Sequence, residues 1–307
     1  MTKEIKKRRM ERKPGRRMDT ISGYLLVAPN LIGFLVFTLF GIGFSLVMAF
    51  TDWNLVRGYE EANFVGLKNF KDMLTDPYLK ACLINNAKLL LVLPIQLFLA
   101  AVLASLMNKA VYGKAGARAM YFLPYVTNIV AIATIWEALF HKTKGPVNAL
   151  LMVLGISESA LPGWLSSSQW ALLAVAIVLL WKDLGYSILM YSGALQQIPQ
   201  ELYEAAEVDG AGVVAKFLHI TIPQLAPMTF MLTILGVVSS LQMWGFVQVI
   251  TNGGPGTSTY TLGLYIYRSS FITNRTGYAC ALAWLLTVLV LTFAIFRWRV
   301  ERKFSVE

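Results

Sequence analysis

The stretch YEAAEVDGAGVVAKFLHITIPQLAP, from Tyr203 to Pro227, lies between two long apolar runs and carries the charge that those runs lack. It contains Glu204, Glu207 and the pair Asp209-Gly210, in a chain of 307 residues that is 56% hydrophobic and only 14% charged. Such a composition is typical of membrane proteins, whose polar segments lie outside the hydrocarbon. We therefore interpret the stretch as a polar connection between two membrane-spanning helices.

Six apolar runs are long enough to cross a membrane, because a helix of about 18 or more residues spans the ~30 Å hydrocarbon core. They lie at about 23–50, 84–108, 118–140, 169–193, 225–250 and 278–297. The predicted fold class is all-α and integral to the membrane, with six transmembrane helices. Residues 1–22 then form a basic tail, residues 23–298 the membrane domain with the polar connection at about 194–224, and residues 299–307 a C-terminal tail.

Basic residues predict the orientation of the chain. Nine of the 27 lysines and arginines precede residue 20, and the positive-inside rule places such a cluster in the cytoplasm. With six spans both termini are cytoplasmic, and the first run is too long for a cleaved signal peptide. A tail that contacts membrane lipid accounts for much of the net charge of +10, so we expect no nucleic-acid partner.

On the residues alone, the polar connection at about 194–224 has two interpretations. Pro199 suits a helix start, Asp209-Gly210 supplies a turn, and a second short helix is expected to stop at Pro223. A helix-turn-helix of this kind is either an interfacial connector or a docking element for a soluble partner.

A spaced motif in this connection resembles the EAA loop of permease subunits from binding-protein-dependent ABC importers. Glu204-Ala205-Ala206 is followed after three residues by Gly210 and, after nine more, by Ile220-Thr221-Ile222-Pro223, with isoleucine where leucine is usual at 222. Four further stretches resemble the sugar-importing branch that includes the larger permease of the maltose transporter. They are FVGLKNF at 64–70, FLPYVTNIVA at 122–131, LQQIPQELYEAAEVDGAG at 195–212 and TNGGPGTST at 251–259.

The resemblance implies a non-catalytic permease subunit in the cytoplasmic (inner) membrane of a bacterium or archaeon. It would form half of the pathway for a sugar or oligosaccharide, with a second homologous permease, two ATPase subunits and an extracytoplasmic sugar-binding protein as partners. Glu204, Ala205, Ala206 and Gly210 would couple it to the ATPase. The sequence has no G-x-x-x-x-G-K-[ST] loop, so ATP and Mg²⁺ are expected on the partner ATPase and no cofactor on this chain.

Two other classes of protein fit the sequence less well. An ion-coupled secondary sugar transporter would need a coupling-ion site, broken helices and repeat symmetry, and it would leave the EAA loop unexplained. A membrane enzyme would need a catalytic constellation, and neither H-E-x-x-H nor a nucleophile–base set is present. The scattered Cys82, Cys280, His141 and His219 show no metal-ligand spacing.

The fourth apolar run carries part of the predicted substrate pathway. Lys182 and Asp183 lie near its centre, where an unpaired charge costs about 2.5–3.5 kcal/mol. Since neighbours on a helix diverge by about 100°, we expect that these two cannot simply neutralise each other within the helix. Asp183, Tyr186 and Ser187 share a face suited to sugar hydroxyls, and we predict a pathway role for Asp183 and Tyr186. A structural ion pair with another helix, for instance with Lys88, is the alternative.

The fifth apolar run carries the rest of the predicted pathway. Gly236, Ser239, Ser240 and Met243 recur at helical spacing, a pattern that also marks close helix packing. In the family that the chain resembles, this segment and the one around Asp183 line the sugar site, so we predict that Ser239, Ser240 and Met243 face the substrate. The asparagine-rich sugar contacts of that family are not reproduced, and the particular sugar is not specified.

The segment TNGGPGTSTY is the predicted contact for the binding protein on the outer side. Gly253, Gly254, Pro255 and Thr257 belong to a glycine-rich path that a helix does not need, and the residues after it could form an amphipathic surface. A plain solvent-exposed loop is the alternative interpretation.

Overall fold

The computed structural model describes residues 15–108 and 114–304, and this part of the chain contains helices and no β-strand. Residues 1–14 of the predicted N-terminal tail lie outside the described part, as do residues 305–307 of the predicted C-terminal tail. The helical architecture confirms the all-α class. The last helix, α17 (Thr276–Phe304), continues into the segment predicted as a C-terminal tail.

Four helices in the described ranges are long and apolar enough to cross a membrane. They agree with the first, second, fourth and sixth predicted runs. They comprise α2 (Gly15–Gly33) with the π-helical η1 (Phe34–Leu39) and α3 (Phe40–Met48), then α5 (Pro77–Leu90) with α6 (Val92–Asn108), then α10 (Ala171–Leu195), and α17.

The third predicted run is bent, so the expectation of a single helix is wrong there, and a second bend lies where the fifth predicted run begins. α7 (Lys114–Val126) and α8 (Ile129–Leu139) meet at an angle of 102°. Asn128 starts α8 as a new helix, because its side chain accepts a hydrogen bond from the backbone N–H of Val130 at 2.8 Å. A bend of 64° separates residues 213–224 from α14 (Ala226–Leu241). Six spans result when each bent pair counts as one.

The fifth run also ends earlier than predicted. α14 stops at Leu241, and a separate short helix, α15 (Gly245–Ile250), follows. In the gap, the hydroxyl of Thr261 donates a hydrogen bond of 2.6 Å to the backbone carbonyl of Met243. A carbonyl that has left the helical ladder thus finds a partner elsewhere in the fold.

The polar connection folds as a helix-turn-helix. It consists of α11 (Gln200–Val208), α12 (Val213–Lys216), the π-helical η3 (Phe217–Thr221) and α13 (Ile222–Gln224). Gly210 has a φ of +78°, which permits the turn. Pro223 does not stop the second helix as expected, because it lies in the first turn of α13, where its missing N–H costs little.

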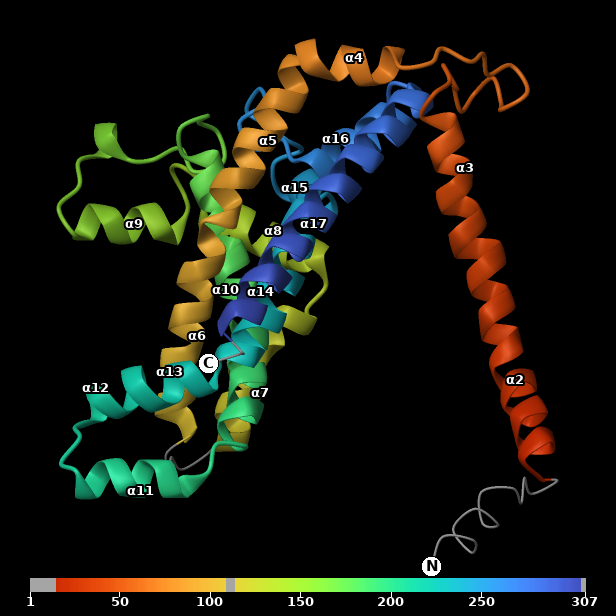
Figure 1. The fold of residues 1–307 in the computed structure, drawn as a ribbon. Coiled ribbons are helices and arrows are strands. Elements are labelled where there is room, and N and C mark those ends of the chain that lie inside the picture. The colour runs from red at the N-terminus through yellow and green to blue at the C-terminus, as the bar shows by residue number, and fades with distance from the viewer. Residues whose placement is uncertain (1–14, 109–113, 305–307) are drawn as a thin grey trace, which may run out of the picture.

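The bundle has two distinct ends (Figure 1). α4 (Lys68–Thr75) lies across one end, near the C-terminal part of α16 (Leu262–Phe271). α11 and α12 lie at the other end. We call these the α4 end and the α11 end. α9 (Pro146–Val153) projects from the side, and the helix formed by α2 and α3 diverges from the bundle but contacts α17 through α3.

The centre of the bundle is the packing of α6 against α10. Ala100 and Ala104 on α6 are fully buried, in one cluster with Ile188 and Tyr191 on α10. Small residues on α6 let the two backbones approach closely. This contact places the polar middle of α10 beside α6 and opposite α14.

Candidate functional site

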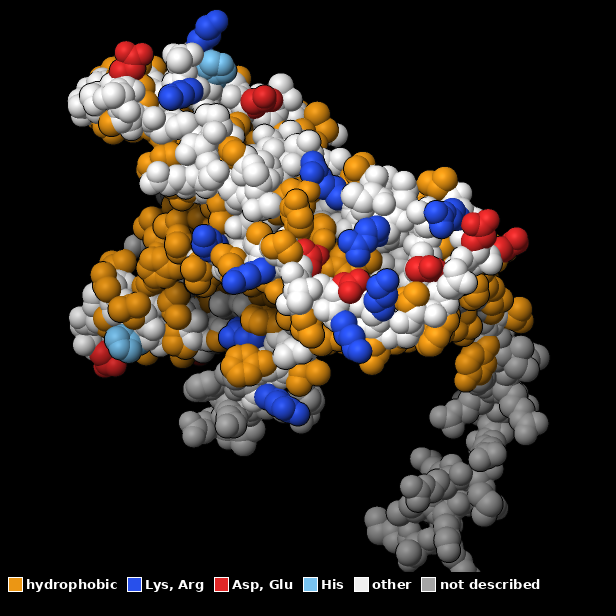
Figure 2. Space-filling view, turned by 90° about the horizontal axis from the view of Figure 1, so that it is seen from above, with side chains coloured by type: hydrophobic (Ala, Val, Ile, Leu, Met, Phe, Trp, Pro, Cys, Tyr) orange, Lys and Arg blue, Asp and Glu red, His pale blue; other side chains and the backbone are white. Residues whose placement is uncertain are grey.

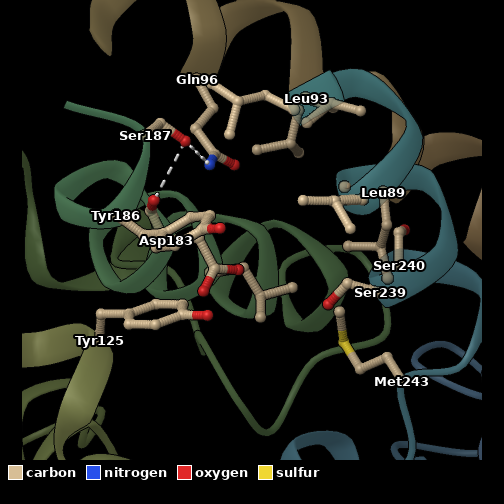
Figure 3. Close-up of a pocket in the computed structure, with 15 residues that line it drawn as sticks. Leu89, Leu93, Gln96, Tyr125, Asp183, Tyr186, Ser187, Ser239, Ser240 and Met243 are labelled. Atoms are coloured by element: carbon tan, nitrogen blue, oxygen red, sulfur yellow. Dashed lines mark hydrogen bonds between the residues drawn. The ribbon is translucent and has the colours of Figure 1, made fainter. Parts of the chain in front are cut away.

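A cavity of about 280 Å³ lies between α5, α6, α10 and α14, with Tyr125 of α7 at its side (Figure 3). All five residues predicted for the pathway line this cavity. Asp183 and Tyr186 come from α10, Ser239 and Ser240 from α14, and Met243 from the segment after α14. The fold therefore brings two separate polar stretches of the sequence to one place.

Asp183 forms an ion pair with its own neighbour in the sequence. Lys182 Nζ lies 2.6 Å from Asp183 Oδ1, and both side chains are partly buried. The expectation that adjacent residues cannot neutralise each other is therefore wrong. Although the two side chains leave the helix in different directions, the lysine side chain is long and flexible enough to reach the carboxylate. The alternative partner, Lys88, is exposed and forms no ion pair within the described ranges. Asp183 Oδ2 remains available to the cavity.

Tyr125 is a cavity residue that the sequence did not reveal. Its ring stacks on Tyr186 with centroids 4.7 Å apart and planes at 18°, and Lys182 Nζ lies 5.2 Å from its centroid. The two rings form a flat aromatic wall contributed by α7 and α10. Tyr125 lies inside FLPYVTNIVA, a stretch recognised for family resemblance only, and its role depends on a partner 61 positions later.

Gln96 is a second lining residue that the sequence did not reveal. Its Nε2 donates to Ser187 Oγ at 2.9 Å, and that hydroxyl donates to the backbone carbonyl of Asp183 at 3.3 Å (Figure 3). Ser187 shares the predicted face with Asp183, but its hydroxyl is already engaged on both sides. Gln96 and Ser187 thus fix α6 to α10 beside the cavity.

The α14 wall combines packing with an unused polar group. A Cβ on Gly236 would lie 2.4 Å from Leu93 Cδ1, so this glycine serves close helix packing. Ser240 is different, because its Oγ is buried and has no hydrogen-bond partner. Leaving a buried hydroxyl unpaired costs about 1–3 kcal/mol, so Ser240 holds an unused polar group in the wall of the cavity.

The residues predicted to couple to an ATPase lie on the surface of the α11 end. Glu204, Ala205 and Gly210 are exposed, and Ala206 is half-buried. The two short helices are held together by a contact of 3.0 Å between the hydroxyls of Tyr203 and Thr221. The helix-turn-helix is therefore a braced unit with its motif facing outwards.

Three valines form an exposed apolar patch beside this motif, which the sequence pattern did not predict. Val208, Val213 and Val214 are 89%, 65% and 70% exposed, respectively. They flank the turn at Gly210. Apolar side chains at the tip of a polar loop are more typical of a contact surface than of a solvated connector.

The predicted binding-protein segment packs closely against the bundle at the α4 end. Asn85 Nδ2 on α5 donates to the backbone carbonyl of Thr257 at 2.9 Å. Gly253 is buried, with a φ of +82°, and a Cβ there would lie 2.5 Å from the Tyr260 ring. Gly254, Pro255 and Thr257 are half-buried and reach the surface. Gly253 therefore shapes the segment and offers no contact surface of its own.

The structure combines membrane-length helices around a partly polar cavity with an exposed helix-turn-helix at one end, an arrangement that suits a membrane transport component. The family described as "Binding-protein-dependent transport system inner membrane component" matches residues 96–306, and the chain belongs to this family. The family resemblance drawn from the EAA-type motif is thereby confirmed, and with it an inner-membrane location and a binding-protein-dependent mode of transport.

Curated relatives and solved structures agree with this assignment. The chain is 33% identical over 273 residues to the probable ABC transporter permease protein PH1215 of Pyrococcus horikoshii, covering 88% of this chain and 92% of the relative. It is 33% identical over 296 residues to the lactose transport system permease protein LacF of Rhizobium radiobacter, covering 94% and 97%. A chain of a bacterial alginate ABC transporter, solved with an alginate pentasaccharide-bound periplasmic protein, shares the fold with a TM-score of 0.80 at 21% identity, covering 96% and 99%.

Proposed function

We propose that this chain forms half of the translocation pathway for a sugar or oligosaccharide in an ATP-driven importer. The single observation that carries the proposal is the cavity, in which Asp183, Ser240 and the Tyr125–Tyr186 wall meet. Relatives at 30–33% identity are named for the transport of lactose and of arabinooligosaccharides, which supports a saccharide as the substrate class.

The chemistry of the cavity suits a saccharide. A stacked pair of tyrosine rings offers an apolar face for the C–H side of a sugar ring, and Asp183 Oδ2 accepts hydrogen bonds from hydroxyl groups. Ser240 Oγ, which lacks a partner, supplies a further polar contact. A site built on such groups discriminates between sugars, because a missing hydroxyl leaves a buried protein group unpaired.

The helix-turn-helix at the α11 end is, in this proposal, the element that docks on an ATPase subunit in the cytoplasm. Exposed Glu204 supplies the charge, and Val208, Val213 and Val214 supply an apolar contact surface. A second homologous permease completes the pathway, and two ATPase subunits bind ATP and Mg²⁺ and hydrolyse the nucleotide. This chain is then non-catalytic and holds no cofactor.

The proposed orientation follows from this docking. With the α11 end in the cytoplasm, both termini are cytoplasmic and the α4 end faces outwards. Gly254, Pro255 and Thr257 would then meet the extracytoplasmic sugar-binding protein, with Gly253 holding their backbone in shape. An ion-coupled transporter finds no support, because the family of the chain is binding-protein-dependent.

Reconstitution of the importer into proteoliposomes tests the proposed function. The vesicles contain this chain, its companion permease and the ATPase, and uptake of radiolabelled saccharide is measured with and without the binding protein. Uptake is expected only when ATP and binding protein are both present. Uptake driven by an ion gradient without the ATPase would contradict the proposal.

A further inference from the structure

A second hollow, of about 490 Å³, lies at the α4 end and shares no lining residue with the translocation cavity. Its walls come from the end of α4, the start of α5, α16 and the start of α17. Since Pro77 and Thr276 begin two membrane-length helices, the hollow lies at the mouth of the bundle. Figure 2, which looks onto this end, shows acidic and basic side chains interspersed over it.

Several hydrogen bonds converge at the base of the hollow. Asp76 Oδ2 accepts hydrogen bonds of 2.5 Å from the hydroxyls of Tyr265 and Tyr278, and Asp76 Oδ1 accepts one of 2.8 Å from the backbone N–H of Tyr78. These bonds connect α5, α16 and α17 at one carboxylate. A preformed site of this kind loses little conformational freedom when a partner binds.

The rim of the hollow carries side chains whose hydrogen-bonding groups are largely unused, although the Tyr78 ring packs against Tyr260 and Tyr265. Tyr78 is 50% exposed, and its hydroxyl makes no hydrogen bond in the described structure. The Arg275 side chain is 56% exposed, lies over the Tyr278 ring at 4.4 Å, and has only a long contact of 3.9 Å with Asp72. Most of its guanidinium donors are therefore unused.

Arg268 connects the hollow to the segment that we propose meets the binding protein. Its guanidinium donates to the backbone oxygen and to Oδ1 of Asn252 at 3.0 and 2.7 Å, and it lies 5.2 Å from the centroid of Tyr260. The hollow and residues 251–259 are thus parts of one continuous surface.

We propose that this hollow is an anchor pocket for the extracytoplasmic binding protein. A surface segment of that protein enters it, places an apolar side chain on Tyr78 and presents a carboxylate to Arg275. Tyrosine and arginine in a pocket are the residues most often found where truncation weakens a protein interface. The inference rests on the proposed function, because it needs a binding protein that delivers substrate to this end of the chain.

A free saccharide is the competing occupant, and the carboxylate chemistry argues against it. Asp76 already accepts bonds from Tyr78, Leu79, Tyr265 and Tyr278. Of the two carboxylates in the lining, only Asp72 can still accept hydrogen bonds from sugar hydroxyls. The unused groups of the rim are the hydrogen-bond donors of Arg275 and the ring and hydroxyl of Tyr78, which suit a protein side chain better than a sugar.

The test measures the dissociation constant of the binding protein for the complete importer in lipid nanodiscs. Tyr78→Ala and Arg275→Ala are each expected to weaken binding on the order of tenfold, and Arg275→Lys to retain part of the affinity. Tyr59→Ala is the matched control, since Tyr59 is 63% exposed in residues 51–67 and outside the hollow. Binding by Arg275→Ala should also depend less steeply on salt than wild-type binding.

Two results would overturn the anchor pocket. The first is a wild-type dissociation constant for the binding protein in Tyr78→Ala and Arg275→Ala importers. The second is loss of labelled-saccharide binding by these variants in the absence of binding protein, which would show that the hollow binds sugar. Both can occur while wild-type uptake still requires the binding protein, in which case the proposed function stands. Failure of the wild-type importer to respond to any binding protein would instead refute both proposals.

Discussion

Asn86 Nδ2 donates a hydrogen bond of 2.9 Å to the backbone carbonyl of Ser240, which lines the cavity between α10 and α14. Asn86 Oδ1 accepts at 2.8 Å from the backbone N–H of Leu262, where α16 begins. Its neighbour Asn85 holds Thr257 in the segment proposed to meet the binding protein. Two consecutive buried asparagines on α5 therefore connect the cavity wall with the surface of the α4 end.

Replacing Asn86 with leucine is predicted to change the KM for sugar uptake. The substitution leaves two buried backbone groups unpaired, at about 1–3 kcal/mol each, and releases the wall that carries Ser240. Asn148→Leu is the matched control, because Asn148 is equally buried and bonds Lys142 and Pro162 away from the cavity. Both variants should lose thermal stability, but only Asn86→Leu should shift KM. An equal KM in the two variants would contradict a positioning role.

Reversing the charge of the coupling motif is predicted to uncouple transport. Glu204→Lys alters an exposed side chain, so the protein should still insert, whereas docking on the ATPase should fail. Gly210→Pro should act similarly, because proline fixes φ near −65° and the turn needs +78°. Uptake and the amount of ATPase that co-purifies are measured together. Wild-type levels of both would refute the docking role.

The apolar patch beside the motif should contribute to the same contact. Val213→Asp and Val214→Asp place a charge in a surface that we expect to be covered, so both should reduce co-purification of the ATPase. Val56→Asp serves as the control, because Val56 is 77% exposed in residues 51–67. Equal co-purification of the ATPase with all three variants would show that the patch is merely solvated.

Asp76 gives a prediction for the dependence of stability on pH. Burial raises the pKa of its carboxyl, but the hydrogen bonds from the hydroxyls of Tyr265 and Tyr278 and from the backbone N–H groups of Tyr78 and Leu79 outweigh it, and the pKa lies below its ordinary value of 3.8. The charged form therefore stabilises the fold above pH 3.8, and this stabilisation is lost as the pH falls through the lowered pKa. Thermal unfolding of wild type and Asp76→Asn in nanodiscs measures it. The difference in melting temperature between wild type and Asp76→Asn should be constant from pH 5 to about 8 and should disappear below pH 3.8. A difference that grows on acidification would contradict the lowered pKa of Asp76.

The hydropathy of the sequence predicted where the chain crosses the membrane, but it did not predict where the helices bend. The bend at Asn128 arises from a side-chain cap, and the second bend lies between residues 224 and 226, so neither changes the apolar character of a run. Polar residues such as Ser240 were predictable because they are costly in an apolar run. The role of Tyr125 was not predictable, because an aromatic residue is common in an apolar run and its stacking partner, Tyr186, lies on another helix.

The error at Lys182 has a simple physical origin. The Cβ atoms of neighbouring helix residues diverge in direction by about 100°. The four-carbon side chain of Lys182 is nevertheless long enough to bring its Nζ within 2.6 Å of Asp183 Oδ1. Asp183 therefore forms an ion pair with Lys182 and also lines the cavity, whereas the sequence suggested that a structural ion pair and a place in the pathway were alternatives.

If the cavity between α10 and α14 selects the sugar, uptake measured under competition should depend on the residues that line it. Proteoliposomes with the complete importer take up one labelled saccharide while a panel of unlabelled sugars competes. Asp183→Asn and Ser240→Leu should reorder the competitors while the binding protein still stimulates ATP hydrolysis. Ser105→Leu, on α6 outside the cavity, should keep the wild-type order. An unchanged order in the assembled Asp183 and Ser240 variants would contradict the claim and assign selectivity to the binding protein alone.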